Sequence, residues 1–167
     1  MKRSNPITVQ INGNRHRYDS ESEMWYACYL EVLRLAGHIK SWEPEPIRFD
    51  FHEHNHRNRP REYTPDFGVV EADGTYVYIE YKGWLQTMDL SRIRRAWDHY
   101  TNDDDSELVF DLVVPFSKKG RQLLAQAQTD HRIRRVINAQ DTIGKCGKAL
   151  LFGVIEWADR PLCRMGY

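Results

Sequence analysis

No stretch of this sequence is long and apolar enough to cross a bilayer, and cysteine is scarce. A membrane-spanning helix needs about 20 consecutive apolar residues, and the chain has no run that approaches this length. The charged N-terminus is followed by no apolar segment, so we expect no signal peptide. The three cysteines are too widely spaced for a metal-binding pair or a disulfide framework. We therefore expect an intracellular protein in a reducing environment, with no membrane partner.

The chain also lacks a net charge. Its 24 Lys and Arg residues equal its 24 Asp and Glu residues, which argues against a strongly basic coat for nucleic acid but not against a local basic patch. Basic residues do cluster, and such clusters are candidates to neutralise phosphates, although an ordinary solvated surface is the alternative. The residues we expect to contact a nucleic-acid backbone are Arg57, Arg59, Arg61, Arg92, Arg95, Lys118 and Lys119.

The chain does contain enough apolar sequence for one packed domain. It has 167 residues, 41% of them hydrophobic, and no linker or internal repeat divides residues 1–167. A capping pair at Ser20 and Glu23 predicts a helix that ends near Gly37, and apolar periodicity predicts another over residues 90–100. Ser117 is the expected cap of a third. We expect strands at residues 7–11, 45–51, 63–71, 75–82, 108–114, 133–137 and 149–157. This order predicts an α/β fold with a mixed central β-sheet flanked by helices, including a three-strand meander.

The meander carries the residues that indicate chemistry. The gap between Asp66 and Glu80 suits a strand, a tight turn and a return strand, which would place the two carboxylates side by side. Adjacent carboxylates repel, and a hard divalent cation relieves the repulsion. We expect Asp66, Glu80 and the backbone carbonyl of Tyr81 to bind magnesium. Lys82 would orient a bound water, help to deprotonate it, or stabilise charge on a phosphate. The alternative is a turn residue beside an exposed ion pair.

Glu23 is a candidate third carboxylate. In isolation it is the capping partner of Ser20. If its helix packs on the sheet, however, the first turn would reach the edge that carries Asp66 and Glu80. The neighbouring Glu21 is the alternative for this position.

The order of these motifs resembles the PD-(D/E)XK nuclease superfamily. The Ser-x-x-Glu pair at residues 20–23, the Tyr-Thr-Pro-Asp-Phe run at residues 63–67 and the Glu-x-Lys-Gly run at residues 80–83 are similar to motifs of the phage endonuclease I family, which resolves branched DNA such as Holliday junctions. They are also similar to motifs of the end-cleaving nuclease subunit of certain transposases. The resemblance covers residues 18–100.

This resemblance implies a restriction-endonuclease-like core and a homodimer. By motif, Glu23, Asp66 and Glu80 would be metal ligands, and Lys82 the catalytic lysine. We expect a magnesium-dependent endodeoxyribonuclease, with manganese able to substitute, acting on branched DNA in recombination in a bacterial or phage-infected cell. The alternatives are a sequence-specific or transposition-type nuclease, a nuclease-fold module that binds DNA without cutting, and RNA as substrate.

Two further features have competing interpretations. On an extended segment, His52, His54 and His56 would share one face, which is an arrangement that could bind zinc. Because no cysteine lies near them, we favour phosphate contact or solvation for these side chains. Trp84 directly follows the Glu-x-Lys-Gly run. Core packing is the default for such an aromatic residue, and stacking on an unpaired base is the alternative.

Overall fold

The computed structural model describes residues 6–51, 61–101, 108–116, 121–146 and 153–156 of the chain. Its centre is a five-stranded sheet in the order β3-β6-β7-β8-β9. The first three strands pair antiparallel, and β7, β8 and β9 pair parallel, so the expectation of a mixed sheet is confirmed. The strands are β3 (Ile39–Pro44), β6 (Phe67–Glu71), β7 (Tyr76–Tyr81), β8 (Phe110–Val114) and β9 (Ile133–Asn138).

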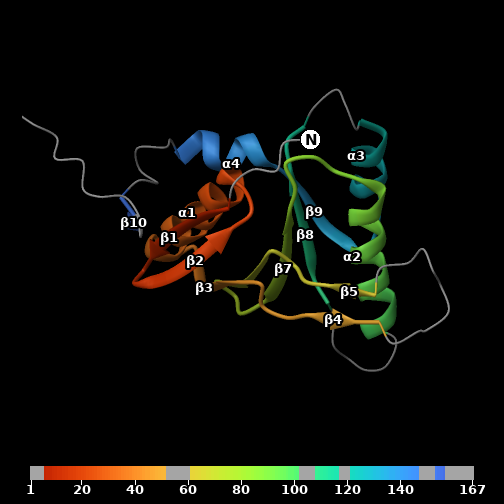
Figure 1. The fold of residues 1–167 in the computed structure, drawn as a ribbon. Helices are drawn as coiled ribbons and strands as arrows, with labels where there is room; N and C mark the ends of the chain where they lie inside the picture. Colours follow the sequence, from red (N-terminus) through yellow and green to blue (C-terminus); the bar gives the residue numbers. More distant parts are fainter. Residues whose placement is uncertain (1–5, 52–60, 102–107, 117–120, 147–152, 157–167) are drawn as a thin grey trace, which may run out of the picture.

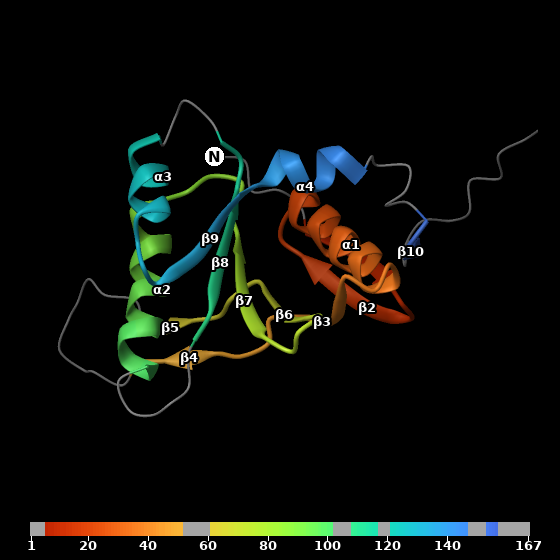
Figure 2. The same ribbon diagram turned by 180° about the vertical axis from the view of Figure 1, so that it is seen from behind.

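Helices cover both faces of this sheet (Figures 1 and 2). One face packs against α1, where Val77 and Ile79 of β7 join a core with the apolar side of the helix. The other face packs against α2 and α3, where Phe110 and Leu112 of β8 join a second core. Alternation along each strand explains the division, since successive side chains point to opposite faces. The helices are α1 (Glu21–Leu35), α2 (Thr87–Tyr100), α3 (Arg121–Gln128) and α4 (Ala139–Cys146).

A small second sheet extends the α1 side. It has the order β10-β1-β2, with β1 (Ile7–Ile11), β2 (Asn14–Tyr18) and β10 (Ile155–Glu156). A two-residue turn joins β1 to β2, and both of its residues have positive φ, 52° at Asn12 and 75° at Gly13, as the right-handed twist of a hairpin favours. Because β2 runs into the cap of α1, the hairpin fixes the start of that helix.

The meander is formed by a different first strand from the one the sequence predicted. The expected strand at residues 45–51 is wrong for most of its length, because the strand that pairs with β6 is β3 and only Phe49–Asp50 (β4) is extended and paired. Glu45 has a φ of 46° and Pro46 follows it, so the chain turns out of the sheet there. β4 then pairs with β5 (Glu62–Tyr63) beside α2 (Figure 1).

Several local predictions are confirmed. Ser20 caps α1 by accepting a hydrogen bond from the backbone N–H of Glu23 over 3.2 Å, and Gly37 lies just past its end with a φ of 77°. Leu90 and Ile93 of α2 are fully buried. β2 and α4 were not predicted. Ser117 and most of the expected last strand lie outside the described residues. Over the part of the chain that the structure describes, none of the helices combines the length and apolar character that a membrane crossing requires.

Candidate active site

Strand pairing brings Asp66 and Glu80 to the same place. Phe67 of β6 lies opposite Ile79 of β7. Asp66, which directly precedes β6, therefore lies beside the last residues of β7, which include Glu80. The backbone N–H of Tyr81 donates a hydrogen bond to Oδ2 of Asp66 over 2.7 Å. This bond ties the carboxylate to the end of β7, where Glu80 also lies.

Lys82 links the two carboxylates. Its Nζ lies 3.0 Å from Oδ2 of Asp66 and 2.8 Å from Oε1 of Glu80. Burial lowers the pKa of Lys82, but the two carboxylates raise it by more, so its pKa is above the usual value and the ammonium stays charged. The side chains that the Glu-x-Lys pattern singled out therefore form one ion-paired group.

Glu80 is held on its other side by Tyr63. The Tyr63 hydroxyl donates a hydrogen bond to Oε2 of Glu80 over 3.0 Å, and both side chains are buried. Burial and the nearby charge of Asp66 raise the pKa of Glu80 to about 7, although Lys82 and Tyr63 act in the opposite direction. Sequence reasoning used Tyr63 only as part of a motif. The sequence did not indicate that Tyr63 contacts Glu80, because the two residues are 17 positions apart and only the fold brings them together.

Glu23 faces the same group from α1. Burial and the charge of Asp66 raise the pKa of Glu23 to about 7, and Lys82 partly offsets them. Glu21, the alternative, accepts a hydrogen bond from Trp25 over 3.0 Å and does not line the pocket at this site. The first turn of α1 thus contributes Glu23 to the acidic group.

Glu23, Asp66 and Lys82 line a polar pocket of about 310 Å³, whereas Glu80 is buried and is not among its lining residues. The pocket lies between the hairpin, the N-terminus of α1 and the end of β7. Sequence analysis missed three of its residues, Arg17, Asp19 and Glu45, because they belong to β2 and to two turns. In the sequence, the only feature that could have indicated these residues is that they lie close to the cap of α1 or to the strands of the meander. The residues that line the pocket are Arg17, Asp19, Ser20, Glu23, Glu45, Asp66, Tyr81, Lys82 and Gly83.

The donor chemistry of this pocket fits a hard divalent cation. Among the described residues, no group of three or more His, Cys, Asp or Glu side chains is arranged to hold a metal ion as it stands, and the Lys82 ammonium lies against both Asp66 and Glu80. With Glu23, however, three carboxylates face one ammonium. Burial raises the pKa of all three carboxylates, and neighbouring carboxylates add to the effect. Additional positive charge would therefore be favourable here.

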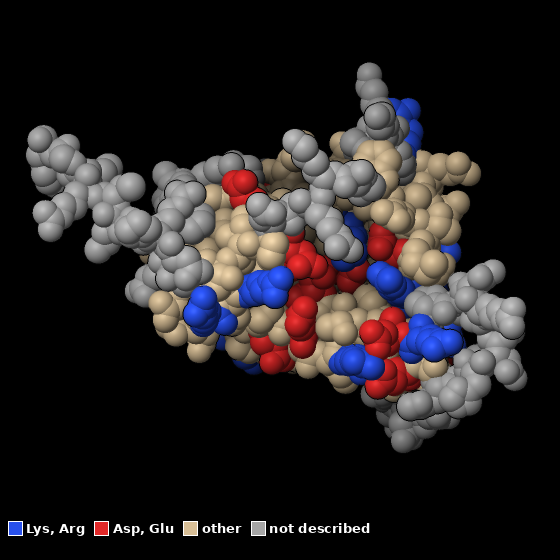
Figure 3. Space-filling model, viewed as in Figure 1, with Lys and Arg blue, Asp and Glu red and all other residues tan. Residues whose placement is uncertain are grey.

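The expected backbone-binding residues are only partly visible. Arg57, Arg59, Lys118 and Lys119 lie outside the described residues, as do His52, His54 and His56. Arg61 is exposed next to β5. On α2, the Arg95 guanidinium lies 4.7 Å from the centre of the Phe51 ring, and Arg92 is partly buried. On the face in Figure 3, Lys and Arg side chains alternate with acidic ones, so the described surface of this face does not form one broad basic patch.

Two further basic residues, Arg134 and Arg135 of β9, are neutralised within the fold. Arg134 and Arg135 both donate hydrogen bonds to Asp111 and Glu71, over 2.7–3.0 Å. Asp111 is fully buried and lies within the strand that the sequence predicted at residues 108–114, where its neighbours are apolar. Trp84 by contrast is 47% exposed, so it does not belong to the core.

Comparison with known proteins gives a family but no activity. No curated protein and no solved structure matches the chain significantly. One family matches over residues 2–104, a span that contains Glu23, Asp66, Glu80 and Lys82. By this match the chain belongs to the family described as "Protein of unknown function (DUF1064)".

Proposed function

We propose that this protein is a metal-dependent DNA endonuclease of the PD-(D/E)XK type, acting on branched DNA. The observation that carries the proposal is the contact of one ammonium, that of Lys82, with the carboxylates of Asp66 and Glu80 at the end of β7. Glu23 faces this group across a polar pocket. An acidic group with a lysine is suited to hydrolysis of a phosphodiester.

The architecture supports the same proposal. A mixed sheet between helices, with an antiparallel meander followed by parallel strands, is compatible with the restriction-endonuclease-like core that the motif resemblance implies. The site lies where the meander ends and where α1 begins. Both elements therefore position the acidic side chains through backbone pairing and capping rather than through a long loop.

Each side chain has a task in this proposal. Glu23, Asp66, Glu80 and the carbonyl of Tyr81 would hold magnesium or manganese. When bound, the ion would stabilise negative charge on the scissile phosphate and lower the pKa of water. The Lys82 ammonium, which contacts Asp66 and Glu80 and lines the pocket, would orient the attacking water or bind a phosphate oxygen.

The substrate preference and the assembly also belong to the proposal. We expect binding to depend mainly on the DNA backbone and on shape, and therefore to weaken steeply with salt. A homodimer would present two pockets to two strands of a junction. The buried, free Cys28 is compatible with a reducing, intracellular setting.

The test compares a four-way junction with a linear duplex of the same sequence, in magnesium and then in chelator. We expect cutting of the junction in magnesium alone. Glu80→Gln should abolish cutting while junction binding persists. The matched control is Glu62→Gln, because Glu62 pairs with Arg48 at an exposed site outside the pocket. Equal cutting of both substrates would contradict selectivity for branches. Junction binding without any cutting would show a non-cutting module.

A further inference from the structure

The β1–β2 hairpin has one face packed in the core and one face open. Pairing places Val9 opposite His16 and Ile7 opposite Tyr18, and Val9 and Tyr18 belong to the core around α1. Because successive side chains of a strand alternate, Arg17 lies on the other face, where it is exposed. In Figure 3, basic side chains lie over this hairpin, next to acidic ones nearer the middle of the face. The hairpin therefore presents Arg17 to a ligand rather than to the core.

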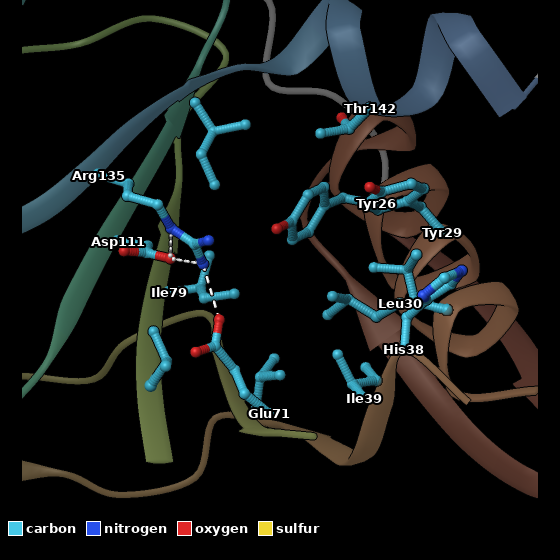
Figure 4. Close-up of a pocket in the computed structure, with 14 residues that line it drawn as sticks. Tyr26, Tyr29, Leu30, His38, Ile39, Glu71, Ile79, Asp111, Arg135 and Thr142 are labelled. Atoms are coloured by element: carbon cyan, nitrogen blue, oxygen red, sulfur yellow. Dashed lines mark hydrogen bonds and ion pairs between the residues drawn. The ribbon is translucent and has the colours of Figure 1, made fainter. Parts of the chain in front are cut away.

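Arg17 brings to the proposed active site a positive charge that no other side chain offsets by direct contact. It lines the acidic pocket, and within the described part of the chain its guanidinium forms no hydrogen bond or ion pair. Arg135, by contrast, is held by Asp111 and Glu71 (Figure 4). The N–H donors of Arg17 are therefore available to an acceptor that carries negative charge.

The position of Arg17 separates it from the proposed metal ligands. Glu23 and Asp66 line the same pocket, yet Arg17 makes no ion pair with either of them, so its guanidinium lies beyond ion-pair distance from both. Lys82 contacts Asp66 over 3.0 Å and is therefore the cation placed at the proposed reaction centre. Arg17 is the second cation that lines the pocket. This arrangement favours contact of Arg17 with a phosphate other than the one at the reaction centre.

An arginine at this place suits the backbone of the proposed DNA substrate. Its planar fork can bond two oxygens of one phosphate, and such contacts position DNA without reading its sequence. We propose that Arg17 binds the phosphate next to the scissile one, so that the β1–β2 hairpin positions the DNA strand in the acidic pocket. The inference rests on the proposed function and adds to it a substrate-binding residue outside the metal site.

The first measurement is binding of a four-way junction to the full chain at several salt concentrations. Calcium replaces magnesium, so that binding is measured without the ion expected to support cutting. Arg17→Gln should weaken binding about tenfold at low salt. It should also reduce the slope of log Kd against log salt by about 0.9, as expected for the loss of one phosphate contact. Arg17→Lys keeps the charge and should recover part of the affinity.

A control variant and a kinetic readout accompany this measurement. Arg121 is also exposed, at the start of α3 on the other face of the sheet, so Arg121→Gln should bind nearly as tightly as the wild type. In cleavage assays with magnesium, Arg17→Gln should raise KM and leave kcat nearly unchanged, because the contact lies away from the reacting atoms.

A scan of neutral phosphates tests where the contact lies. A methylphosphonate, which carries no negative charge, replaces one phosphate at a time around the branch. At the phosphate that Arg17 binds, this replacement should weaken wild-type binding about tenfold and hardly affect Arg17→Gln. Arg15→Gln loses the same charge from the same strand but outside the pocket, so it should remain sensitive at that phosphate. The sensitive phosphate should adjoin the bond that is cut in magnesium.

The outcomes separate this inference from the proposed function. The inference is overturned if Arg17→Gln binds as tightly as the wild type, if it keeps the wild-type sensitivity at every phosphate, or if the sensitive phosphate is the cleaved one. Each of these results can occur while the junction is cut normally. Wild-type protein that shows the Arg17-dependent pattern but never cuts would refute the endonuclease and support the backbone contact. No binding of the junction by the wild type would overturn both.

Discussion

The hydroxyl of Tyr63 donates a hydrogen bond to Oε2 of Glu80 over 3.0 Å, while Lys82 holds the other oxygen of the same carboxylate over 2.8 Å. Both oxygens of Glu80 are therefore oriented before any ligand arrives. Tyr63 does not line the pocket, so its contribution passes through Glu80. Partners that orient a ligating carboxylate in this way usually affect metal affinity as well as activity.

Tyr63→Phe should therefore reduce DNA cleavage by about 10–100-fold and raise the magnesium concentration needed for half-maximal activity. The ring that packs against Phe49 is retained, so the fold should be preserved. Cleavage rates over a magnesium titration measure both effects. Tyr78→Phe, in the same core cluster, is the control and should cleave normally. A Tyr63→Phe variant that cuts more slowly with an unchanged magnesium requirement would show that the hydroxyl does not orient a metal ligand.

The acidic group predicts an unusual dependence of stability on pH. The pKa of Glu23 and that of Glu80 are both about 7 in the folded chain, whereas glutamate in an unfolded chain has a pKa of about 4.3. Between these values the folded state binds more protons, so its stability falls as pH rises from about 4.5 to 7. Urea unfolding across this range, without divalent ions, measures the slope. Glu23→Gln should flatten it and stabilise the fold at pH 8, whereas Glu21→Gln, outside the pocket, should keep it.

The parts of this fold that the sequence predicted correctly are those specified by residues only a few positions apart. The cap at Ser20 and the stop at Gly37 involve residues a few positions apart, so the bounds of α1 could be inferred from sequence. The hairpin turn at residues 72–74 likewise fixes how β6 meets β7, and this register places Asp66 beside Glu80. The helix α1 and the β6–β7 hairpin, which carry the predicted site residues, are therefore both specified by residues close together in the sequence.

Features decided by distant partners could not be inferred in this way. β3 is an edge strand with a mostly exposed, weakly alternating sequence, and only its pairing with β6 makes it a strand. Residues 45–51 alternate more clearly, but their phenylalanines pack on the α2 side. Asp111 is an acid within an apolar run, and its burial depends on Arg134 and Arg135, more than 20 positions away.

Asp111 should be among the residues most sensitive to substitution. It is fully buried and accepts hydrogen bonds from both Arg134 and Arg135. Asp111→Asn removes the buried charge and turns an amide N–H toward the guanidinium groups, which are partly exposed and keep their contacts with Glu71, so it should destabilise the fold by about 2–3 kcal/mol. Chemical denaturation measures the change. Asp50→Asn is the control: Asp50 forms an ion pair with Arg48 in which both side chains are about half exposed, so the loss should be below about 1 kcal/mol. Similar losses for both variants would contradict the buried network.

Trp84 offers a test of how the substrate is held. Its side chain is 47% exposed and directly follows Gly83, which lines the acidic pocket. If the acidic pocket is the proposed nuclease site, an exposed indole beside it can stack on an unpaired base, and such stacking contributes about 1–3 kcal/mol per base. Trp84→Ala should therefore weaken junction binding at least fivefold, leave binding of a linear duplex almost unchanged, and have little effect on stability. Leu35→Ala is the control, since Leu35 is 63% exposed at the far end of α1. An equal loss on junction and duplex would show that the indole contacts the duplex and not an unpaired base.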